Sequence, residues 1–471
     1  MKQRSIAGRI TWRASARRAT DGATFGVALL AFLVTGAPVQ GQALPARSPS
    51  AEAAAASAQL DSLIARALEV NPTIRAARQR IDAARARVGP AGTLPDPMLG
   101  VGIMNLPIAE PGFGDLMTMK TVAIGQTLPF PGKLALARRA AERELEAAGA
   151  RLRATELDIV AEVRKTYFEL AFLDHAFVIL EQNQKLLLSF MQVTESRYVV
   201  GTGTQPDVLK ARVETARLAE QAVALAEERR GVLARLNALL DRPSETAVAG
   251  PSIPERIARA AVADTPAAIR FASSLGARAP DSPLPPLAAL QERAISSSPA
   301  LRAHEAEIAA RTARVQLARK AHLPDFDLSV QYSQRADRSD MVSVIVSAPL
   351  ALHRGSRQDQ QIAEASAEVT ALEADRHAMV NDLRAAVAER YADLERDRAQ
   401  LGLFVGAIIP QGRAALAAAT SSFQVGRVDF LTLLENQTTL FDYEIAYYRA
   451  LTDFANSVAE LERILAAEVL P

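Results

Sequence analysis

The chain has 471 residues, a formal net charge of +1 and no cysteine, so disulfides and thiolate metal sites are excluded. Aromatic residues make up only 5% of it, and alanine is its dominant apolar residue. This composition is typical of long helices that pack through small side chains. It favours a long, narrow helical seam over the two or three compact domains usual at this length.

The N-terminus has the pattern of a secretory signal peptide. A basic segment precedes the apolar stretch Phe25–Ala37 and a run of small residues, which predicts a signal over residues 1–43 and cleavage after Gly41 or Ala43. An uncleaved anchor is the alternative, although the stretch is shorter than the roughly 20 residues that span a bilayer. Cleavage removes six of the 54 basic and one of the 53 acidic residues, leaving 48 against 52. A nucleic-acid partner therefore loses support. No further apolar run of membrane-spanning length is evident, so no other membrane helix is expected.

The rest of the chain contains an internal duplication. The segment Asn71–Asp96 opens with Asn-Pro and ends with Leu-Pro-Asp, and the segment Ser298–Asp325 opens with Ser-Pro and ends with the same Leu-Pro-Asp. The pattern predicts a first structural repeat over 44–241, a Pro- and Ala-rich linker over 242–285 that packs along the outside, and a second repeat over 286–471. A long-period duplication indicates a pseudo-two-fold architecture.

The elements of the first repeat can be predicted in chain order. We expect a helix that breaks before Pro72 and ends at Gly89-Pro90, two strands, a long proline-free helix, a glycine turn, and a returning helix capped by Thr204. These elements cover Leu60–Val88, Met98–Leu106, Met117–Leu128, Lys133–Val200 and Pro206–Leu240.

The second repeat is predicted to follow the same order. Its strands cover Phe326–Ser333 and Val342–Ser347. A long helix follows over Ser356–Val425, broken only at Pro410, and a turn at Gly426 leads to a returning helix over Asp429–Leu465 that Asp429 caps. Two antiparallel helical hairpins result.

The strands alternate apolar residues with small or polar ones. Such alternation over about ten residues is typical of a membrane β-barrel strand, and a half-buried hairpin on a soluble domain is the alternative. Two matching hairpins, each flanked by very long helices in a secreted chain, favour the barrel. Four strands cannot close a barrel alone, and lipid does not tolerate open sheet edges, so a barrel made from these strands has to be oligomeric.

No pattern of catalytic residues is visible. The five histidines are scattered, and neither a His-Glu-x-x-His motif nor a Gly-x-Ser-x-Gly elbow occurs. Acidic and basic residues at helical spacing are most simply solvated ion pairs. We therefore expect no enzyme activity and no cofactor.

The order of these elements, together with the sequence Gln-Thr-Leu-Pro-Phe-Pro-Gly-Lys at Gln126–Lys133, resembles the outer membrane efflux protein (TolC-like) family. The resemblance implies a mainly α fold with a membrane β-barrel portion. It implies a homotrimer in outer-membrane lipid, with long antiparallel helical hairpins forming an α-barrel through the periplasm and four strands per chain contributing to a shared twelve-stranded β-barrel. A periplasmic adaptor and an inner-membrane pump would dock on this passive duct, as parts of a tripartite efflux system or a type I secretion system.

The same resemblance suggests candidate functional residues, counted from the glycine of each turn. Gate candidates are Glu435, Thr432, Asp207 and Lys210. Thr432 departs from the doubly acidic pattern of the family, but three copies of Glu435 would still favour cations at a constriction. Candidates for adaptor docking are Gly201, Thr202, Gly426 and Arg427. The alternatives are an ordinary surface position for Glu435 and simple helix capping for the turns.

Other functions remain open at this stage. A periplasmic coiled-coil adaptor or scaffold without a barrel is the second reading, and a secreted helical enzyme is the third. Met104, Met117 and Met119 could supply soft ligands to an exported metal, or they could be ordinary apolar packing. Export of drugs or other small organic molecules is the main competitor to metal export.

Overall fold

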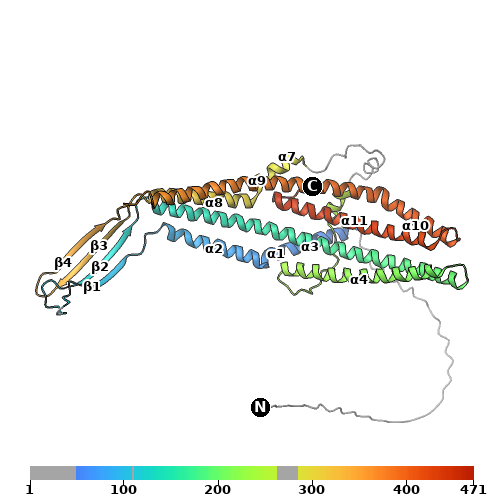
Figure 1. Cartoon of the computed structure of the whole chain (residues 1–471), viewed down its shortest axis with the longest axis horizontal. Coiled ribbons are helices and arrows are strands. Elements are labelled where there is room, and N and C mark those ends of the chain that lie inside the picture. The colour runs from blue at the N-terminus through green and yellow to red at the C-terminus, as the bar shows by residue number, and fades with distance from the viewer. Residues whose placement is uncertain (1–48, 109–110, 263–284, 471) are drawn as a thin grey trace, which may run out of the picture. The chain divides into compact units, whose positions relative to one another are not determined.

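The computed structural model describes residues 49–108, 111–262 and 285–470, and the predicted signal peptide lies outside this part of the chain. Each half contributes a broken helix, a β-hairpin and a helical hairpin (Figure 1). In the first half these are α1 (Pro49–Val70), α2 (Pro72–Gly92), β1 (Met98–Met104), β2 (Met119–Leu128), α3 (Lys133–Val199) and α4 (Gln205–Leu239). In the second half they are α7 (Leu287–Ser297), α8 (Pro299–Lys320), β3 (Phe326–Arg335), β4 (Met341–Ser347), α9 (Gln358–Leu403), α10 (Ile409–Gln424) and α11 (Phe430–Leu465).

The helix break of each half also caps the helix that returns from its hairpin. The Asn71 side-chain amide donates to the carbonyl of Leu239 at 2.9 Å, where α4 ends. The Ser297 hydroxyl donates to the carbonyl of Leu465 at 2.8 Å, where α11 ends. Because the last carbonyls of a helix have no partner within the helix, both contacts satisfy groups that would otherwise be unpaired.

The longest helix, α3, runs without interruption from the sheet to the hairpin tip. Its 67 residues correspond to about 100 Å at 1.5 Å per residue. The main apolar cluster lies partway along it, where α11 packs against both α3 and α9, and it includes the fully buried Tyr167, Phe168 and Leu461. Smaller apolar clusters continue from there toward the tips.

Three local predictions need correction. Helix α2 does not end at Gly89-Pro90 but runs through Pro90 to Gly92, because Gly89, the residue before the proline, has no Cβ to clash with the proline ring. Residues 404–408 form a π-helical turn just before Pro410, which keeps the helix running where the sequence predicted a break. The linker contains α5 (Glu255–Val262), whose Ile257 and Ala261 are buried, so this part of it packs into the core rather than along the outside.

One helical stretch was not expected from the apolar runs. Within Gln358–Gln424, a window is long and apolar enough to cross a membrane by composition, and only 11% of that window is buried. A single such window is weak support for a membrane helix. Small apolar side chains exposed on a single chain suit helix-to-helix packing equally well.

The four strands form one antiparallel sheet in the order β1-β2-β3-β4. The two repeats meet in its centre, where β2 pairs with β3 from Leu128 opposite Phe326 to Met119 opposite Arg335. The outer strands β1 and β4 are each paired on one side only within the described residues.

Candidate functional site

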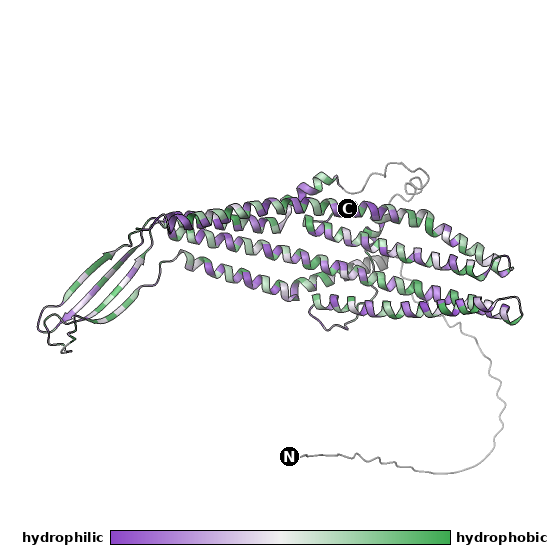
Figure 2. Cartoon of the chain, in the orientation of Figure 1, coloured by the Kyte–Doolittle hydropathy of each residue, from purple (hydrophilic) through white to green (hydrophobic). Residues whose placement is uncertain are grey.

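One face of the sheet is mainly apolar, and its polar members are Lys120 and Gln334 at one end and Gln126 near the other. The strand register aligns alternate residues of all four strands in rows, and Figure 2 shows the resulting apolar bands along the strands. The members of this face are 36% to 77% exposed: Leu99, Val101, Ile103, Val122, Ile124, Phe326, Leu328, Val330, Tyr332, Val342, Val344 and Val346. A soluble protein rarely exposes so large a continuous apolar patch. This surface is suited to lipid.

The opposite face of the sheet is mainly small or polar, with Ile345 and four methionines as its larger apolar members. Thr121 of β2 lies between Gly102 of β1 and Ser333 of β3, and Gln331 pairs with Ser343 of β4. A sheet with one lipid-suited face, one polar face and two open edges has the properties of a barrel segment. Closure needs strands from outside this chain.

The methionines singled out from the sequence come together at the end of this sheet. Met104 and Met119 are directly opposite on β1 and β2, on the polar face, and Met117 lies two residues before Met119. Among the described residues, no group of three or more His, Asp or Glu side chains could hold a metal ion.

A compact polar contact joins the sheet to the helices. The Asp325 carboxylate accepts the N–H of Phe130 at 2.7 Å and the ammonium of Lys133 at 2.8 Å. Partial burial acts to raise the pKa of Asp325, but these two hydrogen bonds outweigh it and the pKa is lowered. Lys320 adds a bond to the carbonyl of Pro131. The repeated Leu-Pro-Asp and Pro-Phe-Pro-Gly-Lys motifs thus meet, which sequence reasoning did not foresee.

The two glycine turns at the hairpin tips have the same geometry. Gly201 and Gly426 have φ of 75° and 73°, a left-handed conformation that favours glycine. In each turn the next N–H closes back onto the preceding helix, from Thr202 to Arg197 and from Arg427 to Ser422. Gly201, Thr202, Gly426 and Arg427 are all exposed, as a docking surface requires.

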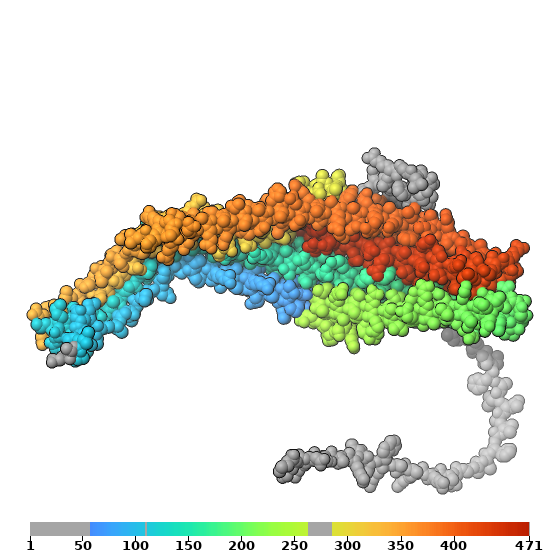
Figure 3. Space-filling model, viewed as in Figure 1, coloured from blue at the N-terminus to red at the C-terminus, as the bar shows by residue number. Residues whose placement is uncertain are grey.

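The two tips are tied to each other. The Arg197 guanidinium donates to the carbonyl of Phe423 at 3.0 Å and lies over its ring at 4.8 Å. Below this contact, an apolar cluster that includes Phe190, Phe430 and Leu433 joins the two hairpins. The space-filling view shows the first hairpin lying directly against the second (Figure 3). The sequence offered no signal for this tie, because its partners are 226 residues apart.

Thr432, one of the gate candidates, is engaged in helix capping. Asp429 accepts the N–H of Thr432 at 2.9 Å and its hydroxyl at 2.6 Å, which confirms Asp429 as the N-cap of α11. Hydrogen bonds from the Thr432 hydroxyl and N–H lower the pKa of Asp429, and the positive charge of Lys210 lowers it further. Lys210 of the first hairpin therefore lies close enough to the second hairpin to stabilise the charged form of Asp429.

The cap predicted for the other returning helix is different. The Thr204 hydroxyl makes no capping bond to the α4 backbone. It donates to the carboxylate of Asp207 at 2.7 Å instead. Asp207 in the first turn of α4 still suits the positive end of the helix dipole, so this gate candidate also has a local structural role.

Glu435 is the gate candidate without a local role. Its side chain is exposed, and no hydrogen bond or ion pair links it to the described residues. Two residues further on, the buried Gln437 side chain donates to the carbonyl and the side-chain oxygen of Asn183 on α3, at 3.2 and 2.8 Å. This second tie between the hairpins was also missed, because a glutamine within a helix carries no distinctive pattern.

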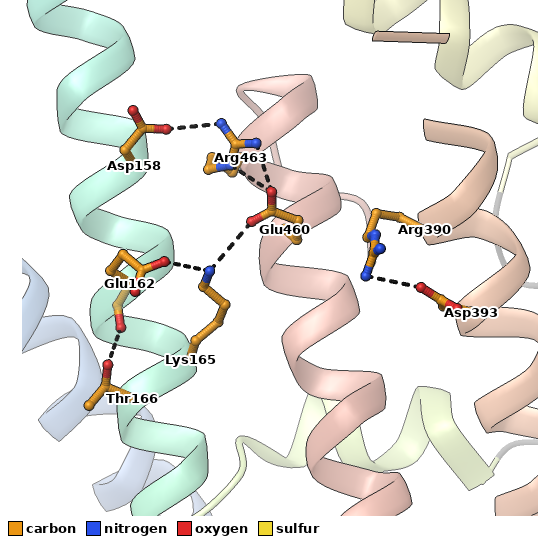
Figure 4. A network of polar contacts seen from close by, with 8 residues as sticks. All are labelled: Asp158, Glu162, Lys165, Thr166, Arg390, Asp393, Glu460 and Arg463. Atoms are coloured by element: carbon orange, nitrogen blue, oxygen red, sulfur yellow. Dashed lines mark hydrogen bonds and ion pairs between the residues drawn. The ribbon is translucent and has the colours of Figure 1, made fainter. Parts of the chain in front are cut away.

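A network of charged residues joins α3 and α11 midway along the helices, and an ion pair within α9 lies beside it (Figure 4). Arg463 contacts Asp158 at 2.9 Å and Glu460 at 2.7 Å, and Lys165 bridges Glu162 and Glu460. Arg390 and Asp393 of α9 form a further pair at 3.0 Å. Residues of both signs, including Lys165, Arg390, Asp393 and Glu460, line an open pocket of about 490 Å³ between the helices. The ion pairs between Arg463 and Asp158 and between Lys165 and Glu460 link α3 to α11 there.

Comparison with known proteins gives a consistent result. The family model described as outer membrane efflux protein matches twice, at residues 63–241 and 290–467. The chain is 24% identical over 413 residues to the cobalt-zinc-cadmium resistance protein CzcC of Cupriavidus metallidurans, covering 86% of this chain and 89% of that one. It is 26% identical over 457 residues to the pyoverdine export outer membrane protein OpmQ of Pseudomonas putida, covering 88% and 90%. The structure of the outer membrane protein VceC from Vibrio cholerae superposes with a TM-score of 0.70 at 20% identity, covering 87% and 97%.

Proposed function

The chain belongs to the outer membrane efflux protein family, and we propose that three copies of it form one passive exit duct through the outer membrane and the periplasm. The sheet of each copy is an arc of a shared twelve-stranded barrel. The helical hairpins of the three copies enclose a tunnel that continues from the barrel lumen. The duct performs no chemistry, and the energy for transport comes from an inner-membrane pump.

The observation that carries this proposal is the sheet. The exposed apolar face is unfavourable in water, and the unpaired strand edges are unfavourable in lipid. Both are satisfied only if other strands pair with the edges and close the sheet into a barrel. A coiled-coil adaptor or scaffold has no use for such a surface, so that alternative has no support. A water-filled polar face and a lipid-suited apolar face on the same four strands are what a barrel needs.

The hairpin tips at Gly201 and Gly426 are the proposed contact of a periplasmic adaptor. Thr202 and Arg427 follow these glycines and are exposed in both turns. Support comes from the matched geometry of the two turns, because one adaptor motif could then engage both hairpins in the same way. Capping and docking are compatible, since capping uses the backbone and docking would use the exposed side chains.

Glu435 is the proposed selectivity residue of the gate. It is the exposed, unpaired carboxylate near the tip of the second hairpin, and three copies would place three negative charges around the tunnel. Thr432 and Asp207 contribute to the structure of the helix starts instead, and Lys210 moderates the charge near Asp429.

The cargo is not assigned by similarity. The chain matches, at comparable identity, one relative named for metal resistance and another named for pyoverdine export. The paired methionines Met104 and Met119 would suit a soft cation but equally suit apolar packing.

Planar bilayer recording of the purified mature protein tests the proposal. We expect discrete, long-lived conductance steps from the trimeric fraction and none from material dissociated by boiling. A trimeric fraction that inserts into lipid and conducts no ions would contradict the duct.

A further inference from the structure

The two repeats contain equivalent junctions between sheet and helices, and only one is complete within the chain. Aligned on their Leu-Pro-Asp motifs, Asp325 before β3 corresponds to Asp96 before β1. Aligned on the proline that follows each strand pair, Pro129-Phe130 after β2 corresponds to Pro349-Leu350 after β4. In the complete junction, Asp325 holds the Phe130 N–H and the Lys133 ammonium at 2.7 and 2.8 Å.

The second junction has an aspartate, a backbone N–H after the proline and nearby basic side chains, but it lacks the contact. His353 stands at the position equivalent to Lys133, and two arginines, Arg354 and Arg357, follow it. Asp96 is exposed, and no donor among the described residues bonds to its carboxylate. Leu350 and Leu352 are 79% and 80% exposed. The two guanidinium groups that follow them, in Arg354 and Arg357, are exposed too, and neither forms an ion pair with a described residue.

Sheet topology explains why this junction is open. Strands β2 and β3 are neighbours inside the chain, so their junction closes internally. Strands β4 and β1 are the two edges of the sheet, so the equivalent junction can close only between β4 of one copy and β1 of the next.

The strand register predicts how the edges would meet. Inside the chain Gln126 lies opposite Leu328. The equivalent pair across the boundary is Val346 opposite Leu99 of the neighbouring copy. Both residues belong to the exposed apolar face, so this register keeps the lipid-suited face continuous, whereas a slip of one residue would break it.

We propose that Asp96 of one copy binds the Leu350 N–H and the Arg354 and Arg357 guanidinium groups of the next copy, repeating across each subunit boundary the contact that Asp325 makes inside the chain. The partner is a second copy of this chain. The inference rests on the trimeric duct proposed above. It adds the strand register between β4 of one copy and β1 of the next, and the residues that contact each other at that boundary.

Cysteine cross-linking tests the register directly, because the natural chain contains no cysteine. The double variant Leu99→Cys/Val346→Cys of the full chain should form covalent trimers on non-reducing gels, since directly opposite residues of antiparallel strands have Cβ atoms within about 5.5 Å. The matched control is Gln126→Cys/Leu328→Cys, which occupies the equivalent positions inside the chain. It should cross-link within each chain and give only a monomer band after boiling.

A double-mutant cycle tests the contact. Asp96→Asn should weaken the detergent-solubilised trimer by roughly tenfold for each subunit boundary that is broken on dissociation, the order expected when one charge-assisted hydrogen bond is lost at each boundary. Arg354→Gln/Arg357→Gln should have a similar effect. Combining all three changes should add little, because each set removes the same interaction.

The outcomes separate this inference from the proposed function. Wild-type protein that is monomeric by native mass spectrometry would overturn the duct itself. A wild-type trimer in which Leu99→Cys/Val346→Cys gives no inter-chain product would overturn the register. Correct cross-linking combined with fully additive effects in the cycle would overturn the Asp96 contact, as expected if Arg354 and Arg357 bind anionic lipid headgroups instead.

Discussion

Glu435 is an exposed carboxylate near the tips, and no described residue forms an ion pair or a hydrogen bond with it. Changing Glu435 to Gln should lower the preference of the reconstituted channel for cations over anions, because three negative charges would leave the constriction. Glu220, an exposed glutamate of α4 further from the tip, offers the matched control Glu220→Gln. Reversal potentials in asymmetric KCl measure the effect. Equal selectivity in both variants would remove Glu435 from the gate.

Arg197 ties the first hairpin to the second at the tips. Replacing it with Gln removes the bond to the Phe423 carbonyl and the contact with the Phe423 ring. If the tunnel is narrowest at the tips, looser hairpins should raise the mean conductance or open probability. Arg217, which pairs only with Glu214 of its own helix, provides the control Arg217→Gln. If the contact between Arg197 and Phe423 has no part in gating, both variants will have wild-type conductance.

Asp429 gives the start of α11 a pH dependence with a defined sign. Its pKa is lowered in the folded chain, so its contribution is complete above the unfolded pKa of about 3.9 and is lost as the pH falls through the folded pKa. Hydrogen-exchange protection of the first turn of α11 should therefore decrease below about pH 4.

Asp429→Asn is the control for this prediction, because asparagine also caps helices but does not titrate. Its protection factors should stay flat over the same pH range. Parallel loss of protection in both proteins would assign the effect to another group.

For single residues, the sequence predicted local structural roles, such as helix caps and turns, better than it predicted long-range contact partners. The Asp429 cap and the two glycine turns followed from local patterns and are confirmed, whereas Thr204 donates to Asp207 rather than capping α4. The contacts of Asp325, Arg197 and Gln437 could not be predicted, because their partners lie 190 or more residues away. Only the repeated Leu-Pro-Asp motif hinted that Asp325 mattered.

At the scale of elements, the two faces of β4 should respond oppositely to charge. Lysine at Val344, on the apolar face, should destabilise the inserted protein by about 2–4 kcal/mol if that position lies near the middle of the bilayer. Lysine at the adjacent Ser343 should have a much smaller effect, since this residue belongs to the polar face. Unfolding from lipid vesicles in urea compares the two variants. A similar cost at both positions would contradict the assignment of the faces.

The positions of the strands and helices were largely predictable, because apolar residues recur along a strand and along a helix with different periods. Alternation placed all four strands to within a few residues, and the long proline-free run placed α3. The remaining differences involve tertiary context. Pro90 and Pro410 sit in continuing helical segments, and α5 forms inside the linker where Ile257 and Ala261 find a buried site.

At the scale of the whole molecule, the duplication organises the architecture. The family model matches each half separately, and the same contacts recur in both halves, including the caps on Leu239 and Leu465. Two equivalent hairpins per chain would give a trimer six quasi-equivalent tips around its tunnel. The predicted boundaries of the signal peptide, linker and repeats stay predictions.

Whether three chains share one closed β-wall can be measured by native mass spectrometry of the protein extracted from outer membranes in mild detergent. We expect a single dominant species with the mass of three mature chains, resistant to dissociation until heated. A monomer that is recovered from the water-soluble fraction and never found with outer membranes would contradict it.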